Sequence, residues 1–127
     1  MKLLGVDYGT KNIGLARAST DVPIALPFGI IDNADHENAM AQLLQMIQTE
    51  GIEKIIVGLP FGLDGSENEN TKRIRNFFSE MQSRVNTPVE FINEMFSSHA
   101  SDRLSGGASR DEKSAMIILQ NYLDRRI

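Results

Sequence analysis

The sequence contains no cysteine and no tryptophan among its 127 residues, and each absence excludes a class of chemistry. Without cysteine, neither a disulfide framework nor a thiolate nucleophile or metal site can form. Aromatic residues make up 6% of the chain, which argues against a stacking platform for single-stranded nucleic acid. The two histidines, His36 and His99, have no partner at zinc-ligand spacing, so neither is predicted to bind zinc.

Long apolar runs and a surplus of basic residues are also missing. No apolar stretch approaches the ~20 residues of a membrane span, and the N-terminus lacks a signal-peptide pattern. We therefore expect a cytoplasmic protein with no membrane partner. The net charge is −4, from 13 Lys and Arg against 17 Asp and Glu. This balance disfavours charge-driven nucleic-acid binding, but it is compatible with a nuclease whose acidic site is neutralised by metal.

The length and the apolar content of 41% predict one globular domain over residues 1–127. Short apolar or β-branched runs predict five strands, at residues 3–6, 13–18, 25–31, 54–60 and 89–92. The first three are joined by short links, which favours antiparallel pairing. The last two alternate with helical patterns, which favours parallel pairing through helical crossovers.

Helical spacing and end signals predict three longer helices. The first lies between Asp35, a plausible N-cap, and Gly51, a plausible stop. Capping boxes at residues 66–69 and 109–112 begin the other two. A short helix is also expected over residues 98–104. The chain therefore predicts an α/β fold: a five-stranded mixed sheet, three antiparallel strands then parallel additions, flanked by helices.

Three acidic residues fall near the ends of these elements. Asp7 ends the first strand, Glu94 follows the fifth strand, and Asp111 lies in the first turn of the last helix. Ligands of open α/β sheets gather at strand ends, so the three carboxylates can converge from distant parts of the sequence. Other roles stay open: Asp7 could accept backbone N–H groups in the following turn, and Asp111 could interact with the helix dipole.

Converging carboxylates without a His or Cys cluster suit hard cations, Mg²⁺ or Mn²⁺. Two such ions about 3.5–4 Å apart can clamp a phosphodiester and activate water against it. Lys11, just after the Asp7 turn, and Lys72 and Arg75 on the second long helix are candidates for contacts with nucleic-acid phosphates. Their alternative is a role as solvated surface cations.

Four segments, in order along nearly the whole chain, resemble the YqgF family. They are GVDYGTKNIG (5–14), IIVGLPFGLDGSE (55–67), the Asn93–Glu94 pair followed by Ser97–Ser98, and DEKSAMIILQNYLD (111–124). The resemblance implies an RNase H-like fold and hydrolysis of nucleic-acid phosphodiesters with Mg²⁺ or Mn²⁺. By position, it implies that Asp7, Glu94 and Asp111 are the catalytic and metal-binding acids.

Three functions remain open. The first is a nuclease that processes the 5′ end of precursor 16S rRNA in ribosome biogenesis, with a ribosomal subunit precursor as partner. The second is a Holliday junction resolvase acting on four-way DNA, which requires a dimer because two active sites must act. The sequence does not specify the oligomeric state. The third, motivated by Asn93, Met95 and the short loop before Asp111, is a catalytically weak module that binds nucleic acid or protein on the same fold.

Overall fold

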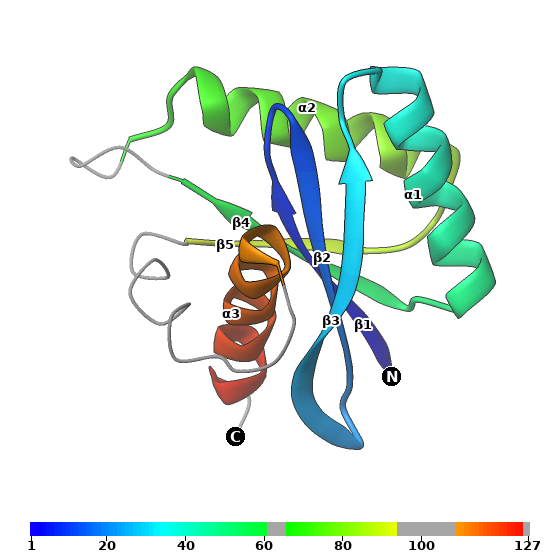
Figure 1. Cartoon of the computed structure of the whole chain (residues 1–127), viewed down its shortest axis with the longest axis vertical. Helices are drawn as coiled ribbons and strands as arrows, with labels where there is room; N and C mark the ends of the chain where they lie inside the picture. The colour runs from blue at the N-terminus through cyan, green and yellow to red at the C-terminus, as the bar shows by residue number, and fades with distance from the viewer. Residues whose placement is uncertain (61–65, 94–108, 126–127) are drawn as a thin grey trace.

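A five-stranded mixed sheet lies at the centre of the computed structural model, which describes residues 1–60, 66–93 and 109–125 (Figure 1). The elements are β1 (Lys2–Tyr8), β2 (Asn12–Ser19), β3 (Val22–Asp32), α1 (His36–Glu50), β4 (Lys54–Leu59), α2 (Glu69–Arg84), β5 (Val89–Asn93) and α3 (Arg110–Arg125). The sheet order is β3-β2-β1-β4-β5. β2 pairs antiparallel with β1 and β3, whereas β4 pairs parallel with β1 and β5. The predicted fold class is therefore confirmed.

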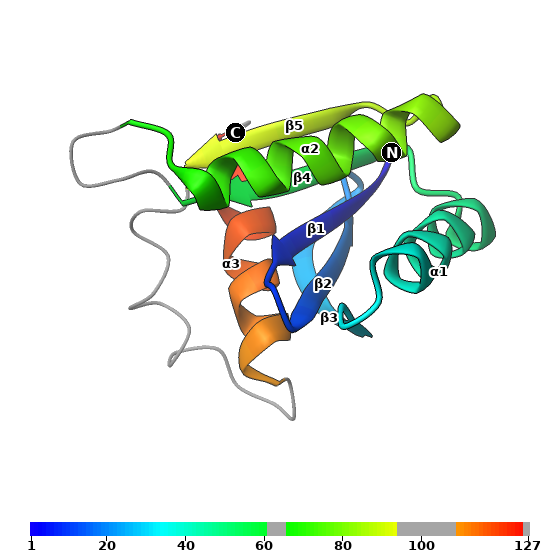
Figure 2. The same cartoon turned by 90° about the horizontal axis from the view of Figure 1, so that it is seen from above.

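Helices cover both faces of the sheet, as Figure 2 shows from above. Since successive side chains of a strand point to opposite faces, β1 contributes to two separate cores. On the face covered by α1 and α2, Leu4 and Val6 pack in one core with Phe77 and Phe78. On the other face, Leu3 packs in a second core with apolar residues of α3.

Two glycines let α3 approach β1 and β2 closely. A Cβ atom at Gly5 would lie 2.7 Å from the Cβ of Leu119 and 2.9 Å from the carbonyl oxygen of Ala115. A Cβ atom at Gly14 would lie 2.1 Å from the carbonyl oxygen of Asp111. A side chain at either position would push the helix away, so these glycines fix the height of α3 above the sheet.

Three of the predicted helix boundaries are confirmed. The Asp35 side chain accepts a hydrogen bond from the N–H of Asn38 at the start of α1, and Gly51 ends that helix in the left-handed conformation, with φ 66°. At the start of α3, Ser109 and Glu112 form the predicted capping box. The Ser109 N–H donates to Glu112 Oε1 at 3.0 Å, and the Glu112 N–H donates to Ser109 Oγ at 3.2 Å.

The predicted capping box at residues 66–69 is wrong, because α2 is capped by Asn68. Asn68 Oδ1 accepts from the N–H groups of Asn70 and Thr71, and the Thr71 hydroxyl accepts from the Asn68 N–H at 2.7 Å. Thr71 is fully buried, so this arrangement also satisfies a hydroxyl within the core. Ser and Asn are equally good N-cap residues, and residue type alone did not separate them.

The third strand is longer than the pattern predicted, since β3 begins at Val22 and includes Pro23. Proline is tolerated there because β3 is an edge strand, with no strand of the described residues paired on its outer side. The helix predicted over residues 98–104 lies outside the described residues. No helix in the described part of the chain is long and apolar enough to cross a membrane.

Candidate active site

Asp7 lies near the end of β1, the central strand of the sheet. Its neighbours Val6 and Tyr8 point into the core beneath α1 and α2. By alternation, the half-buried Asp7 side chain points to the opposite face, which α3 covers. A carboxylate placed this way loses part of its hydration and requires hydrogen-bond or cationic partners.

Hydrogen bonds hold the turn that follows Asp7. The N–H of Gly9 donates to the carbonyl oxygen of Asn12 at 2.9 Å. Asn33, just after β3, donates from its side chain to the Gly9 carbonyl at 2.8 Å and from its backbone to the Lys11 carbonyl at 2.8 Å. The turn is therefore rigid, and it presents the exposed Lys11 at the same end of β1 as Asp7.

The start of α3 brings Asp111 to Asp7. In the β1–β2 ladder Asp7 pairs with Gly14, and the backbone of Asp111 lies directly over Gly14. The capping residue Glu112 anchors this first turn a second time, because its Oε2 accepts from the N–H of Gly29 in β3 at 2.7 Å. The hydrogen bond from the Ser109 N–H, and after it the one from Gly29, hold the pKa of Glu112 below its usual value, so the anchor is a carboxylate at neutral pH.

The charge of Asp111 acts on Asp7. Burial, followed by the negative charge of Asp111, raises the pKa of Asp7 from 3.8 to about 6, and a hydrogen bond with the Ser114 side chain opposes the rise. A bound cation would lower that pKa by compensating both charges. The available donors are carboxylate and hydroxyl oxygens, which are the ligands that Mg²⁺ and Mn²⁺ prefer.

Ser114 is the functional candidate that the sequence reasoning missed. It lies three residues after Asp111, so both side chains share one side of α3. That spacing is a signal in the sequence, but it becomes informative only once the helix is placed beside Asp7. Hydrogen bonding by the Ser114 side chain lowers the pKa of Asp7 and so favours its ionised form.

Glu94, the third predicted acid, lies outside the described residues. It follows Asn93, the last residue of β5, which pairs with Leu59 at the end of β4. Because β1, β4 and β5 are parallel, their carboxyl ends lie at one edge of the sheet. The described structure therefore brings together Asp7 and Asp111, with the end of β5 at the same edge.

The predicted phosphate-binding cations are divided between two places. Lys11 lies in the turn after Asp7, but Lys72 and Arg75 lie on α2, which covers the other face of the sheet. Arg75 pairs with Glu67 and stacks on Phe91, with its guanidinium carbon 5.0 Å from the ring centroid. Lys72 is 66% exposed and lines a hollow of about 390 Å³ beside Tyr8 and His36. The structure thus leaves Lys72 accessible and engages Arg75 within the fold.

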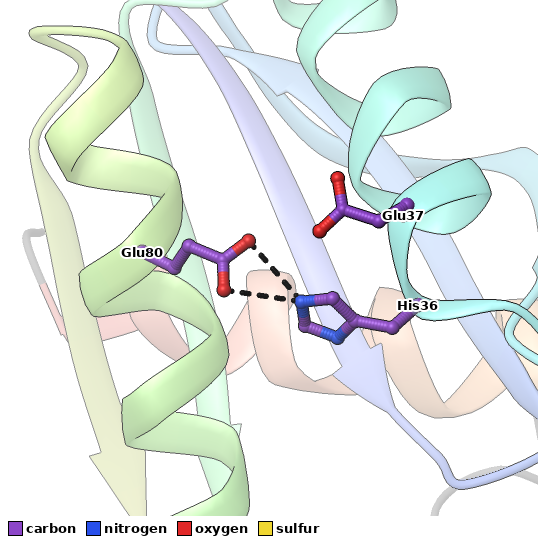
Figure 3. Close-up of side chains that lie close together, drawn as sticks. All are labelled: His36, Glu37 and Glu80. Carbon is purple, nitrogen blue, oxygen red and sulfur yellow. Dashed lines mark hydrogen bonds and ion pairs between the residues drawn. The ribbon is translucent and has the colours of Figure 1, made fainter.

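A second polar cluster joins α1 to α2, as Figure 3 shows. His36 Nε2 lies 3.1 Å from each carboxylate oxygen of Glu80, and Glu37 lies beside them. Arg84 Nη2 lies 3.1 Å from Glu80 and 3.5 Å from Glu37. Among the described residues, this is the one group of His and acidic side chains whose ligand atoms are close enough for a single metal ion. Arg84 already supplies the positive charge, so the cluster is explained as an interhelix ion-pair network.

The sequence reasoning missed this network because His36 and Glu80 are 44 residues apart. His36 has no partner at zinc-ligand spacing in the sequence, as expected, but the fold brings Glu80 to it from a distant helix. The network lies on the α1 and α2 side of the sheet, and Asp7 faces α3. It is therefore separate from the Asp7–Asp111 site.

Comparison with known proteins agrees with this architecture. A model of the RuvX family, described as Holliday junction resolvase, matches residues 1–125. A protein of Maridesulfovibrio salexigens named "Putative pre-16S rRNA nuclease" is 34% identical over 134 residues, covering 98% of this chain and 99% of the relative.

Solved structures share the fold at lower sequence identity. Thermus thermophilus RuvC in complex with a Holliday junction substrate superposes with a TM-score of 0.70 at 15% identity, covering 99% of this chain and 95% of RuvC. The fowlpox virus Holliday junction resolvase gives a TM-score of 0.61 at 18% identity, covering 98% and 99%. These neighbours confirm the expected RNase H-like fold. The family match and the 34% identity confirm the resemblance to YqgF proteins, and the chain belongs to the RuvX family.

Proposed function

We propose that this chain is a metal-dependent nuclease that hydrolyses a phosphodiester bond of precursor 16S rRNA. The names of its relatives and its family membership support nuclease activity on nucleic acid. One observation carries the assignment of the site: α3 rests on Gly14 and thereby holds Asp111 beside the half-buried Asp7. Two neighbouring carboxylates, one of them half-buried, destabilise the fold when both are ionised unless a cation compensates their charge.

Asp7 and Asp111 are the proposed ligands of Mg²⁺ or Mn²⁺, and Glu94 is proposed to join them from the end of β5. When bound, the metal would polarise a phosphate oxygen and lower the pKa of a bound water. The protein contributes fixed positions. Asp7 is held within the central strand, and Asp111 is held by a helix whose first turn is capped and tied to β3. This preorganisation removes the cost of gathering the acids during the reaction.

The surroundings of the acids also favour an anionic substrate. Asp111 lies in the first turn of α3, where the helix dipole stabilises negative charge on a side chain or on a phosphate. Lys11 lies in the rigid turn after Asp7, where we propose that it contacts a substrate phosphate. Lys72 is proposed to contact the nucleic acid more weakly, at the hollow beside Tyr8.

A four-way DNA junction is the second candidate substrate. The description of the RuvX family and the likeness to two resolvases favour it. Symmetric cleavage of a junction requires two active sites, whereas processing of an RNA end requires one. A third outcome, binding without cleavage, corresponds to the catalytically weak module.

The deciding experiment is a cleavage assay on two substrates, a 5′ fragment of precursor 16S rRNA and a four-way DNA junction. Wild type, Asp7→Asn and Asp111→Asn are each assayed with Mg²⁺, Mn²⁺ or EDTA. Asp21→Asn is the matched control, since Asp21 is an exposed acid in the β2–β3 turn. We expect cleavage of the RNA that is lost in EDTA. In the two site variants it falls more than about 100-fold, beyond the effect typical of residues that only support a metal ligand.

The pattern of results separates the candidates. Cleavage of the junction alone would replace the rRNA assignment with the resolvase assignment and keep the site. Full activity of Asp7→Asn would refute the site. Metal-independent binding of either substrate by folded wild-type protein, with no product in Mn²⁺, would refute the nuclease assignment.

A further inference from the structure

The edge strand β3 exposes a row of large apolar side chains. Val22, Ile24 and Leu26 are 61%, 60% and 48% exposed, and they alternate along the strand together with the partly buried Phe28. Alternate residues of a strand share one face, so these four residues form a continuous stripe, which we call the β3 strip. Contiguous exposed apolar surface of this kind marks an interaction site more often than isolated apolar residues do.

The β3 strip lines a hollow of about 310 Å³. Leu3, Ala18 and Ile52 extend its apolar lining, and the charged side chains of Arg17 and Glu50 lie on it as well. The hollow exists because α1 ends at Glu50, so the helix that covers this side of the sheet stops before the end of the β2–β3 hairpin. Figure 1 shows the hairpin tip projecting at the bottom of the view, away from α1 and α2.

The outer backbone edge of β3 is closed to pairing with another strand. Pro23 and Pro27 have no N–H group to donate. The N–H of Ala25 donates to Gln120 Oε1 at 2.9 Å, and the N–H of Gly29 donates to Glu112 Oε2. These features prevent edge-to-edge β-pairing, so a partner must bind through the side chains of the strip.

Two opposite charges border the hollow without forming an ion pair within the described part of the chain. The Arg17 guanidinium stacks on Phe28, with its carbon 5.1 Å from the ring centroid, and it forms none of the ion pairs found between described residues. The Glu50 carboxylate likewise forms none of the ion pairs found between described residues. An apolar centre with one cation and one anion beside it is complementary to a copy of itself.

We propose that the β3 strip is the interface through which two copies of this chain form a two-fold symmetric dimer. A two-fold axis places the strip of one copy against the same strip of the other. Arg17 of each copy then faces Glu50 of the other, so that both charges are compensated at the border of the interface. Ile24 and Leu26 form its apolar centre.

The proposed dimer leaves both candidate active sites open. The strip lies beside the start of β1, since Ser19 pairs with both Lys2 and Val22. From that end, Asp7 is five residues further along β1, roughly 16 Å at the rise of an extended strand. Leu26 lies nearer, since it pairs with Arg17, which pairs with Leu4. Phe28 of the strip packs against the core beneath α1 and α2, whereas Asp7 faces α3. The dimer therefore uses a different face of the sheet from the candidate active site, and it does not depend on the nuclease assignment.

Sedimentation velocity over a range of concentrations tests the interface. From about 1 μM to about 1 mM, the wild type is expected to shift from monomer toward dimer, the range of a modest interface. Ile24→Asp places a charge in the apolar centre and is expected to raise the dimer dissociation constant about tenfold or more. Ile30→Asp is the matched control, because Ile30 is a 43% exposed isoleucine on the same strand that does not line the hollow. Thermal unfolding of each variant verifies that it is folded.

A charge exchange tests the two-fold arrangement. Arg17→Glu alone and Glu50→Arg alone each place like charges together and are expected to weaken self-association. An equimolar mixture of the two variants is expected to associate as the wild type does, because both contacts between unlike chains become Glu–Arg pairs. A wild type that stays monomeric over the whole range overturns the proposal. So does a mixture that associates no better than its separate components, or a loss of association in Ile30→Asp but not in Ile24→Asp.

Discussion

The two faces of the sheet are packed by different means. Beneath α1 and α2, large side chains such as Phe77 and Phe78 fill the space between helix and sheet. Beneath α3, Gly5 and Gly14 leave almost no space, and the helix backbone rests on the strands. Both faces gain stability from buried apolar area. The second face also fixes a position, because it sets where Asp111 lies relative to Asp7.

The largest effect that tests this comparison is a cavity in the first face. Phe78→Ala removes a fully buried ring and is expected to lower the free energy of unfolding by about 3–5 kcal/mol. Denaturant unfolding measures the loss. Cleavage per folded molecule is expected to stay unchanged, since the Asp7–Asp111 site lies on the other face. A large loss of specific activity in protein shown to be folded would contradict the separation of the two faces.

A methyl group at Gly14 tests the second face. In Gly14→Ala the new Cβ would lie 2.1 Å from the Asp111 carbonyl oxygen, so the start of α3 must move. Misplacement of catalytic groups by about 1 Å can cost ~100-fold in rate, and we expect a loss of that order in cleavage. Ser19→Ala on the same strand is the control and is expected to be fully active. Normal cleavage by Gly14→Ala would show that the height of α3 does not determine activity.

A third expected effect, of similar size, is a gain in stability from removing the buried charge. The pKa of Asp7 is about 6 in the folded protein, against its ordinary value of 3.8, which applies in the unfolded chain. Ionisation of Asp7 therefore destabilises the metal-free fold. The penalty is absent below about pH 4 and complete above about pH 6, where it reaches about 3 kcal/mol. In EDTA, Asp7→Asn is therefore expected to be more stable than wild type at pH 8 and equally stable at pH 4.

Thermal unfolding as a function of pH measures this difference, with Asp21→Asn as the control for loss of an exposed acid. Adding Mg²⁺ at pH 8 is expected to stabilise the wild type and not Asp7→Asn. Parallel pH profiles for wild type and Asp7→Asn would show that Asp7 carries no buried charge.

The sequence pattern predicted what depends on local periodicity and capping. It placed the five strands, the Asp35 and Ser109 caps, and the carboxyl-end position of Asp7. The approach of Asp111 to Asp7 was also expected, because helix and strand ends converge in such sheets. The roles of these acids, and that of Glu94, stay predictions.

What the pattern did not reveal depends on contacts between distant segments. No local rule shows that Gly14 lies under α3, that Ser114 reaches Asp7, or that His36 meets Glu80 across two helices. The placement of Lys72 and Arg75 on the face opposite Asp7 likewise follows from helix packing. The choice of Asn68 over Ser66 as the cap depended on burial of Thr71, which is also a tertiary property.

The hydrogen bonds from α3 to the edge of β3 have a consequence for local opening. The amide hydrogens of Ala25 and Gly29 lie on an edge strand, where amides ordinarily exchange rapidly with solvent. Here they are held by Gln120 and Glu112, so they are released only when α3 separates from the sheet. Hydrogen exchange at these two positions therefore reports the opening of α3, and with it the separation of Asp111 from Asp7.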